Sequence, residues 1–239
     1  MMSTVIIIDG DRMKNDKEDK QPDLLNSAAN EEKRRRALLE RCAAYKDKLK
    51  KRDPQEIARL AAMSLQKNNE GKPVLSGEHL LETYHISWPE LKITGNHGKP
   101  APLSKEMLWL HYLDHADGHP LTRRWVNLSE IGGLFYQQAF QGYCGDELAA
   151  AWGKEIDELR GKCLATGGWE MNGPGDLAFE WRILPRLPLC LCYRLPEETD
   201  EGEIKEAWAT MLFDAASDHY VAADVAAIVA KELAEQLKP

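Results

Sequence analysis

Two consecutive runs of alternating side chains constrain the fold of this chain more than any other feature. In residues 177–183, LAFEWRI, large apolar side chains alternate with smaller or charged ones, and residues 187–193, LPLCLCY, repeat the alternation. A period of two is typical of a half-buried strand, and two such strands joined by a short turn form an antiparallel hairpin. Pro188 predicts that the second strand begins at a sheet edge, because proline cannot donate to the strand ladder.

Helical periodicity lies on both sides of this hairpin. Apolar residues recur at spacings of four, three and four between Glu31 and Arg52, and Asp53-Pro54 supplies an N-cap and a first-turn proline for a second helix that continues to Ser64. Because strands and helices come in separate clusters, the sequence predicts the α+β class: a small antiparallel sheet packed with helices, a helical N-terminal region and a C-terminal helix. The apolar face of the closing helix is predicted to consist of Val225, Ile228, Val229, Leu233 and Leu237.

In the central part of the chain, the sequence predicts a series of short helices and strands. Residues 105–114 form a helix with Ser104 as its N-cap, and residues 107–113 are apolar almost all round, so we expect this helix to be buried on most sides. Gly132-Gly133 is expected to open an aromatic helix through Phe140. Further strands are expected over residues 79–88, 91–94, 123–128 and 209–213.

We divide the chain into a tail and one domain. Residues 1–30 combine a short apolar run, Val5–Ile8, with a charged and polar tract, which predicts a mostly disordered or loosely attached tail. An added strand, with Asp9 and Asp11 available to a cation, is the alternative. Residues 31–239 are long enough to bury an ordinary core and are predicted to form a single α+β domain.

Composition argues against several classes of function. The formal net charge is −8 and the pI is near 5.5, so we expect no general affinity for nucleic acid or for an anionic membrane. Five scattered cysteines indicate free thiols in a reducing compartment. Because no apolar run reaches the roughly 18–20 residues that span a bilayer, we expect a soluble, cytoplasmic protein.

The first candidate site is a histidine-rich stretch. His111 and His115 lie four residues apart on a predicted helix, so both rings could face one divalent metal, with Asp114 or His119 as a third ligand. A metal-dependent, hydrolase-like enzyme would follow, although the HExxH arrangement is absent. The alternative is a core His111 that is hydrogen-bonded internally, with the other two histidines at the surface. Whether the chain is an enzyme stays open.

The second candidate is a pocket lined by aromatic side chains. It would hold a tetrapyrrole, a corrinoid or haem, with His111 as axial ligand. An ordinary aromatic core is the alternative interpretation. The residues concerned are Tyr112, Trp125, Phe135, Tyr136 and Phe140.

The third candidate is the basic helix over residues 31–52. Lysine and arginine are concentrated at residues 33–36 and 48–52, which favours either a protein-interaction module or a solvated helix face. No aromatic residues interleave these charges, so recognition of single-stranded nucleic acid is not indicated.

Four segments, taken in order, carry a family resemblance. They are LHYL at 110–113, GHPLTRRWVNLSEIGGLFYQQAF at 118–140, GGWEMNGPGDLAFEWRILPRLPL at 167–189, and LFD with VAADVAAIVAKEL at 212–233. This combination resembles a family of proteins from anaerobic bacteria and archaea classed as domain of unknown function 3786. The resemblance covers Glu31 to Leu237.

Some members of that family resemble fusions to a small cysteine-rich domain of the type that binds an iron–sulfur cluster in corrinoid proteins. The resemblance therefore implies cofactor handling in anaerobic metabolism. Its pattern includes His111 but neither His115 nor His119, which favours His111, Asp176 and Asp214 as positions on which the fold or the site depends. We accordingly expect a non-catalytic accessory protein that binds a cofactor or ligand related to corrinoid, haem or iron–sulfur chemistry, with a small molecule or a protein as its partner.

Overall fold

The computed structural model describes residues 24–198 and 202–239 of the chain. The predicted strand at Val5–Ile8 and the carboxylates Asp9 and Asp11 lie outside these residues.

The chain divides into two compact units, residues 1–37 and Leu38–Pro239. The first described helix, α1 (Leu24–Leu49), begins in the first unit, where the side chains of residues 30–37 are exposed. This confirms the amphipathic helix expected between Glu31 and Arg52, and extends it toward the N-terminus. All other described elements belong to the second unit.

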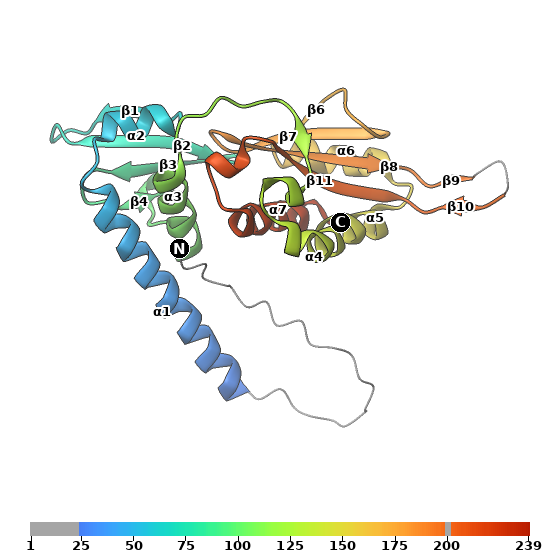
Figure 1. The fold of residues 1–239 in the computed structure, drawn as a ribbon, viewed down its shortest axis with the longest axis horizontal. Helices are drawn as coiled ribbons and strands as arrows, with labels where there is room; N and C mark the ends of the chain where they lie inside the picture. The colour runs from blue at the N-terminus through green and yellow to red at the C-terminus, as the bar shows by residue number, and fades with distance from the viewer. Residues whose placement is uncertain (1–23, 199–201) are drawn as a thin grey trace. The chain divides into compact units, whose positions relative to one another are not determined.

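Two antiparallel sheets form the framework of the second unit (Figure 1). A two-stranded ribbon of β9 (Glu197–Glu198) and β10 (Ile204–Lys205) accompanies them. The smaller sheet has the order β1 (Ser64–Lys67), β2 (Pro73–His79), β3 (Glu82–Ser87) and β4 (Ile93–Thr94). The larger sheet has the order β5 (Trp125–Val126), β11 (Trp208–Asp214), β8 (Leu187–Arg194), β7 (Leu177–Leu184) and β6 (Trp169–Glu170).

Helices pack against these sheets, which confirms the α+β class. In Figure 1, α3 lies below the smaller sheet, and α4, α5 and α7 lie below the larger one. Between α4 and α5, the π-helical turn η4 (Gln141–Asp146) lies along the free edge of β11, where the Gln141 side chain donates to the carbonyl oxygen of Ala209. The α-helices of this unit are α2 (Pro54–Leu60), α3 (Leu103–His115), α4 (Gln137–Phe140), α5 (Glu147–Trp152), α6 (Ile156–Ala165) and α7 (Ala223–Leu237).

The predicted hairpin is confirmed as β7 and β8, but β7 is not half-exposed. Apart from Arg182, both of its faces are buried, including the carboxylate-bearing Glu180. The expectation for Pro188 holds at the start of β8. Although β8 lies between β7 and β11 in the sheet, its pairing with β11 begins only at Leu189, so the strand has a free edge at the proline.

Several predicted boundaries in the first half of the chain are also wrong. The second helix ends at Leu60, because the backbone turns through a positive φ at Ala62 and enters β1 at Ser64. The strand expected over residues 79–88 is interrupted by a turn with positive φ at Leu80, which separates β2 from β3. By contrast, Asp53 is the predicted N-cap of α2, since its side chain accepts from the N–H of Gln55 at 3.0 Å.

Three further expectations need correction. Helix α3 starts after Pro102 without a side-chain cap, so Ser104 is a helical residue and not the N-cap. The aromatic helix expected from Gly132-Gly133 through Phe140 is divided into the 3-10 turn η3 (Leu134–Tyr136) and the short helix α4, and a further 3-10 turn, η2 (Leu128–Ile131), precedes Gly132, whose φ is 95°. On α7, Ile228 is 56% exposed instead of facing the core.

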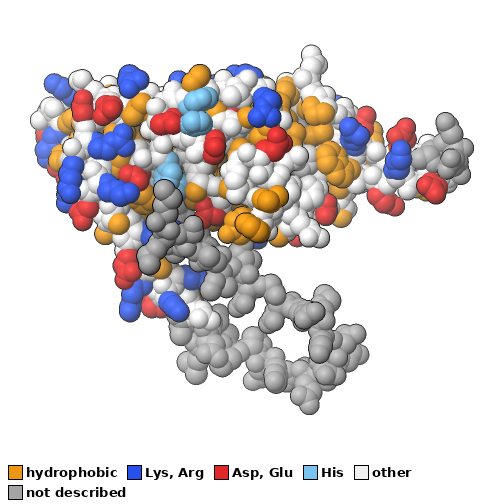
Figure 2. All heavy atoms as spheres, in the orientation of Figure 1, with side chains coloured by type: hydrophobic (Ala, Val, Ile, Leu, Met, Phe, Trp, Pro, Cys, Tyr) orange, Lys and Arg blue, Asp and Glu red, His pale blue; other side chains and the backbone are white. Residues whose placement is uncertain are grey.

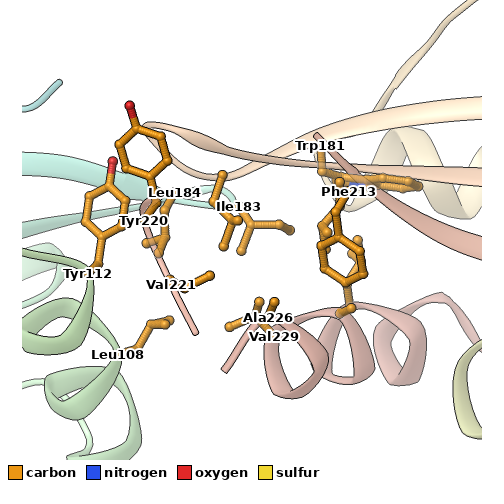
Figure 3. Close-up of a cluster of buried hydrophobic side chains, with 14 of the residues drawn as sticks. Leu108, Tyr112, Trp181, Ile183, Leu184, Phe213, Tyr220, Val221, Ala226 and Val229 are labelled. Atoms are coloured by element: carbon orange, nitrogen blue, oxygen red, sulfur yellow. The ribbon is translucent and has the colours of Figure 1, made fainter. Parts of the chain in front are cut away.

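A shared core lies between the larger sheet, α3 and α7 (Figure 3). Each fully buried large side chain stabilises such a core by roughly 1.5–3 kcal/mol relative to an exposed position. Gly77 of β2 allows α3 to approach the smaller sheet closely, since a Cβ atom there would lie 2.9 Å from the Trp109 ring. Figure 3 labels core residues from these elements, among them Leu108 and Tyr112 of α3, Trp181 and Ile183 of β7, Phe213 of β11, and Ala226 and Val229 of α7.

Candidate functional site

A pocket of about 260 Å³ lies between α1, α3 and α7 within the second unit. Each helix contributes one stripe of side chains, because residues three or four apart on a helix share a face. Most of the lining is apolar, with Arg41, Lys105, Glu232 and His111 as its ionisable members. The lining residues are Leu38 and Arg41 of α1, Ser104, Lys105, Met107, Leu108 and His111 of α3, and Val225, Ile228, Val229 and Glu232 of α7.

Helix α1 is held along α3 by a second stripe of contacts. The Cys42 thiol lies 3.9 Å from the Met107 sulfur, and the Lys46 ammonium forms an ion pair with Glu106 at 2.5 Å. Burial raises the pKa of Cys42 to about 11, so this thiol stays protonated at neutral pH. The α1 wall of the pocket is therefore fixed by apolar and ionic contacts together.

His111 is buried and lines the pocket, and both of its ring nitrogens have partners. The backbone N–H of Ala222 donates to Nε2 at 3.1 Å, so this nitrogen carries no proton. Nδ1 therefore bears the proton of the neutral ring and donates to the Tyr45 hydroxyl at 2.9 Å. Burial, together with the charges of the nearby His115 and Arg41, lowers the pKa of His111 to about 3.

The other three predicted metal ligands, His115, Asp114 and His119, have different partners. Nδ1 of His119, in the loop after α3, donates to the Pro120 carbonyl oxygen at 2.9 Å. The His115 ring stacks on His111 with centroids 3.8 Å apart, but its Nδ1 donates to the His111 carbonyl oxygen at 2.9 Å. Asp114 forms an ion pair with Lys48 at 3.1 Å. No group of three or more His, Cys, Asp or Glu side chains with metal-binding geometry occurs within the described residues.

A second polar cluster adjoins the pocket at Lys105. Its ammonium group donates to Nε2 of His79 at 2.6 Å and also contacts the Glu232 carboxylate. Nδ1 of His79 donates to the carbonyl oxygen of Ile183 at 3.0 Å. Burial lowers the pKa of His79, and the Lys105 charge lowers it further, so the ring is neutral.

Sequence reasoning missed this cluster because its members come from β2, α3 and α7. The separations are 26 residues between His79 and Lys105 and 127 between Lys105 and Glu232. One usable signal was present, since Glu232 follows Val225 and Ile228 at helical spacing and so continues an apolar stripe with a charge.

The aromatic residues of the predicted flat-ring pocket are dispersed. Tyr112 and Phe140 are fully buried in the core, whereas the Phe135 side chain is 93% exposed. Trp125 lies in β5, and Tyr136, at the end of η3, is half-buried. Of the residues predicted to bind a cofactor, the lining described above includes His111 alone.

The two predicted aspartates differ sharply in surroundings. Asp214 is fully buried and accepts from the backbone N–H groups of Thr122, Arg123 and Ala216 at 2.6–3.0 Å, and from the Thr122 hydroxyl at 2.9 Å. Although burial acts to raise the pKa of Asp214, these hydrogen bonds hold it below its ordinary value. Asp176 is exposed and accepts from the N–H of Leu195 at 2.8 Å.

Fold and pocket together define an α+β protein with an apolar, helix-lined pocket. Residues 53–236 match a family model described as a domain of unknown function (DUF3786), and the chain belongs to this family. The match begins at the N-cap of α2, so α1 lies outside it. No curated protein and no solved structure matches the chain. Within the described residues, no helix is long and apolar enough to cross a membrane.

Replacement of Asp214 by alanine is expected to destabilise the protein strongly. The substitution removes the acceptor of three backbone N–H groups, those of Thr122, Arg123 and the buried Ala216, which we expect to lower the free energy of unfolding by about 3 kcal/mol or more. Urea denaturation at pH 7.5 measures this value. Asp176→Ala, which removes one exposed acceptor, is the matched control and should cost about 1 kcal/mol or less. Equal losses in the two variants would contradict the assignment of Asp214 as a buried anchor.

The neutral His111 predicts a loss of stability in mild acid. The unfolded ring takes up a proton below its ordinary pKa of 6.5, whereas the folded ring resists protonation until about pH 3. Between pH 7.5 and pH 5 this difference lowers the free energy of unfolding by about 2 kcal/mol. We expect His111→Gln to lose that share of the pH dependence, and the exposed-site variant His85→Gln to keep it. Identical pH profiles for wild type and His111→Gln would refute the prediction.

Proposed function

We propose that this protein is a non-catalytic binding protein for a small, mostly apolar ligand that carries one carboxylate group. The observation that carries the proposal is the position of Arg41 at a mostly apolar pocket. Among the described residues, the Arg41 guanidinium has no ion-pair partner. A guanidinium of this kind can donate two parallel hydrogen bonds to a carboxylate.

The charge balance of the pocket supports an anionic ligand. The Lys105 ammonium is neutralised by Glu232, and His111 is neutral, so Arg41 leaves the lining with one net positive charge. A partly desolvated positive charge is stabilised by an anion, and the apolar side chains around it favour a hydrocarbon portion next to that anion. One end of the ligand is therefore expected at Arg41, with its apolar part between α3 and α7.

The volume of the pocket indicates that its ligand is smaller than a tetrapyrrole. About 260 Å³ lies below the range of roughly 300–1,000 Å³ that is typical for drug-sized ligands. Axial ligation of a haem or corrinoid by His111 would also require Nε2 to give up the hydrogen bond from Ala222. The size and lining of the pocket thus favour an accessory protein that binds a small ligand.

Octanoate is a suitable probe for this proposal. Calorimetric titration of the full chain should give a dissociation constant on the order of 0.1–1 mM, as expected for a ligand of this size. Arg41→Gln should weaken octanoate binding about tenfold, because a hydrogen bond to a charged group contributes roughly 1.5–3 kcal/mol. Binding of octanol, which lacks the charge, should change little in the same variant.

Arg36→Gln is the matched control, since Arg36 is an exposed arginine on the same helix. Val225→Phe, which places a larger side chain in the lining, should weaken both octanoate and octanol. The proposal fails if octanoate does not bind the intact chain, or if Arg41→Gln and Arg36→Gln bind it equally well.

A further inference from the structure

A hollow of about 440 Å³ opens where the smaller sheet meets the larger one and β2 lies next to β7. Strand β2 contributes Ser76 and Glu78 to its lining, β7 contributes Arg182, and the turn between β7 and β8 contributes Arg186. Leu121, from the loop before β5, adds an apolar side chain. The hollow shares no lining residue with the pocket between α1, α3 and α7, so the two are separate sites.

Neither arginine of this hollow has a charged partner within the described residues. The guanidinium groups of Arg182 and Arg186 take part in no ion pair and no side-chain hydrogen bond there. Glu180, two residues before Arg182 and on the same face of β7, is already paired with Arg123 at 2.8 Å. On the face drawn in Figure 2, basic and acidic side chains are mostly interspersed. Two positive charges without a counterion at one hollow therefore stand out.

The Arg186 side chain is half-buried, and its surroundings leave its charge without compensation. Its Nε atom is enclosed and has no hydrogen-bond partner in the part of the chain that the structure describes, whereas its terminal nitrogens are not enclosed and can be reached by a ligand. The Arg186 charge acts on the hydroxyls of Tyr112 and Tyr220, but burial raises the pKa of both phenols, so neither neutralises it. A partly desolvated cation of this kind is stabilised by a bound anion.

Ser76 adds a hydroxyl group to the two guanidinium groups. Its Oγ lies 2.7 Å from Nδ1 of His85, its cross-strand partner on β3. In the tautomer that carries the proton at Nδ1, the ring donates to Oγ and leaves the hydroxyl hydrogen for an acceptor in the hollow. Both sheets therefore supply hydrogen-bond donors to the same space.

We propose that this hollow binds the phosphate group of a small phosphorylated molecule, with Arg182 and Arg186 as charged ligands and Ser76 as a further donor. A phosphate monoester carries about 1.5–2 negative charges at neutral pH and accepts paired hydrogen bonds from guanidinium groups, so it suits two arginines better than a single carboxylate does. Glu78, an exposed member of the lining, leaves the hollow with one net positive charge. Its carboxylate can accept from a hydroxyl group of the ligand next to the phosphate.

Glycerol 3-phosphate and inorganic phosphate are suitable probes, because the first adds hydroxyl groups to the same anion. Calorimetric titration of the full chain at low ionic strength should give one saturable site that binds glycerol 3-phosphate several-fold more tightly than inorganic phosphate. Arg182→Gln and Arg186→Gln should each weaken glycerol 3-phosphate about tenfold, and Ser76→Ala about threefold. Arg194→Gln is the matched control, since Arg194 is an exposed arginine at the far end of the same hairpin, and it should bind as the wild type does.

Modification of the wild-type chain with phenylglyoxal, which reacts with arginine side chains, tests the site without a variant. Bound glycerol 3-phosphate should protect Arg182 and Arg186 from the reagent, whereas Arg194 should react equally with and without it, as measured by mass spectrometry of peptides. Absence of this protection would overturn the proposal.

Equal affinity of folded Arg182→Gln, Arg186→Gln and Arg194→Gln for glycerol 3-phosphate would overturn it as well, with circular dichroism as the check on folding. Inorganic phosphate bound as tightly as glycerol 3-phosphate would show a site for the ion alone and reject a phosphorylated molecule as the ligand. Arg41→Gln, which should weaken octanoate, should leave glycerol 3-phosphate binding unchanged, so the two sites are tested separately.

Discussion

The arrangement of the pocket depends on the two hydrogen bonds that the neutral imidazole ring of His111 forms. The ring belongs to α3, bonds the Tyr45 hydroxyl of α1 through Nδ1, and accepts the backbone N–H of Ala222, the residue that precedes α7, through Nε2. The same three helices line the pocket. A protonated ring would lose its acceptor and clash electrostatically with the Ala222 N–H, so burial of an uncharged histidine is a condition for the geometry of the site.

Sequence patterns were sufficient for the elements whose surroundings are local. The hairpin of β7 and β8, the Asp53 N-cap and the buried α3 follow from alternation, capping chemistry and apolar spacing, each within one short segment of the chain. The same patterns failed where distant segments decide the outcome. Glu180, which alternation alone predicts to lie on an exposed face, is buried because Arg123, 57 residues earlier, pairs with it.

In the candidate site, too, local sequence patterns predicted some features, whereas contacts between distant segments decided others. Helical spacing correctly placed His111 in a buried helix and so favoured the internally hydrogen-bonded alternative, but it could not indicate which ring nitrogens are free to bind a metal. That property depends on Tyr45 and Ala222, which lie 66 and 111 residues away. The Lys105 cluster with His79 and Glu232, and the hollow lined by Ser76, Arg182 and Arg186, likewise join residues that no short sequence window contains.

The pocket is built partly from residues inside the family match and partly from residues outside it. Two of its walls, α3 and α7, lie within the matched residues 53–236, whereas Leu38 and Arg41 come from α1, outside the match. In this chain, the residue proposed to select the charge of the ligand therefore lies outside the segment that defines the family. A substitution within one turn of α1 would alter that selection without any change in the matched segment.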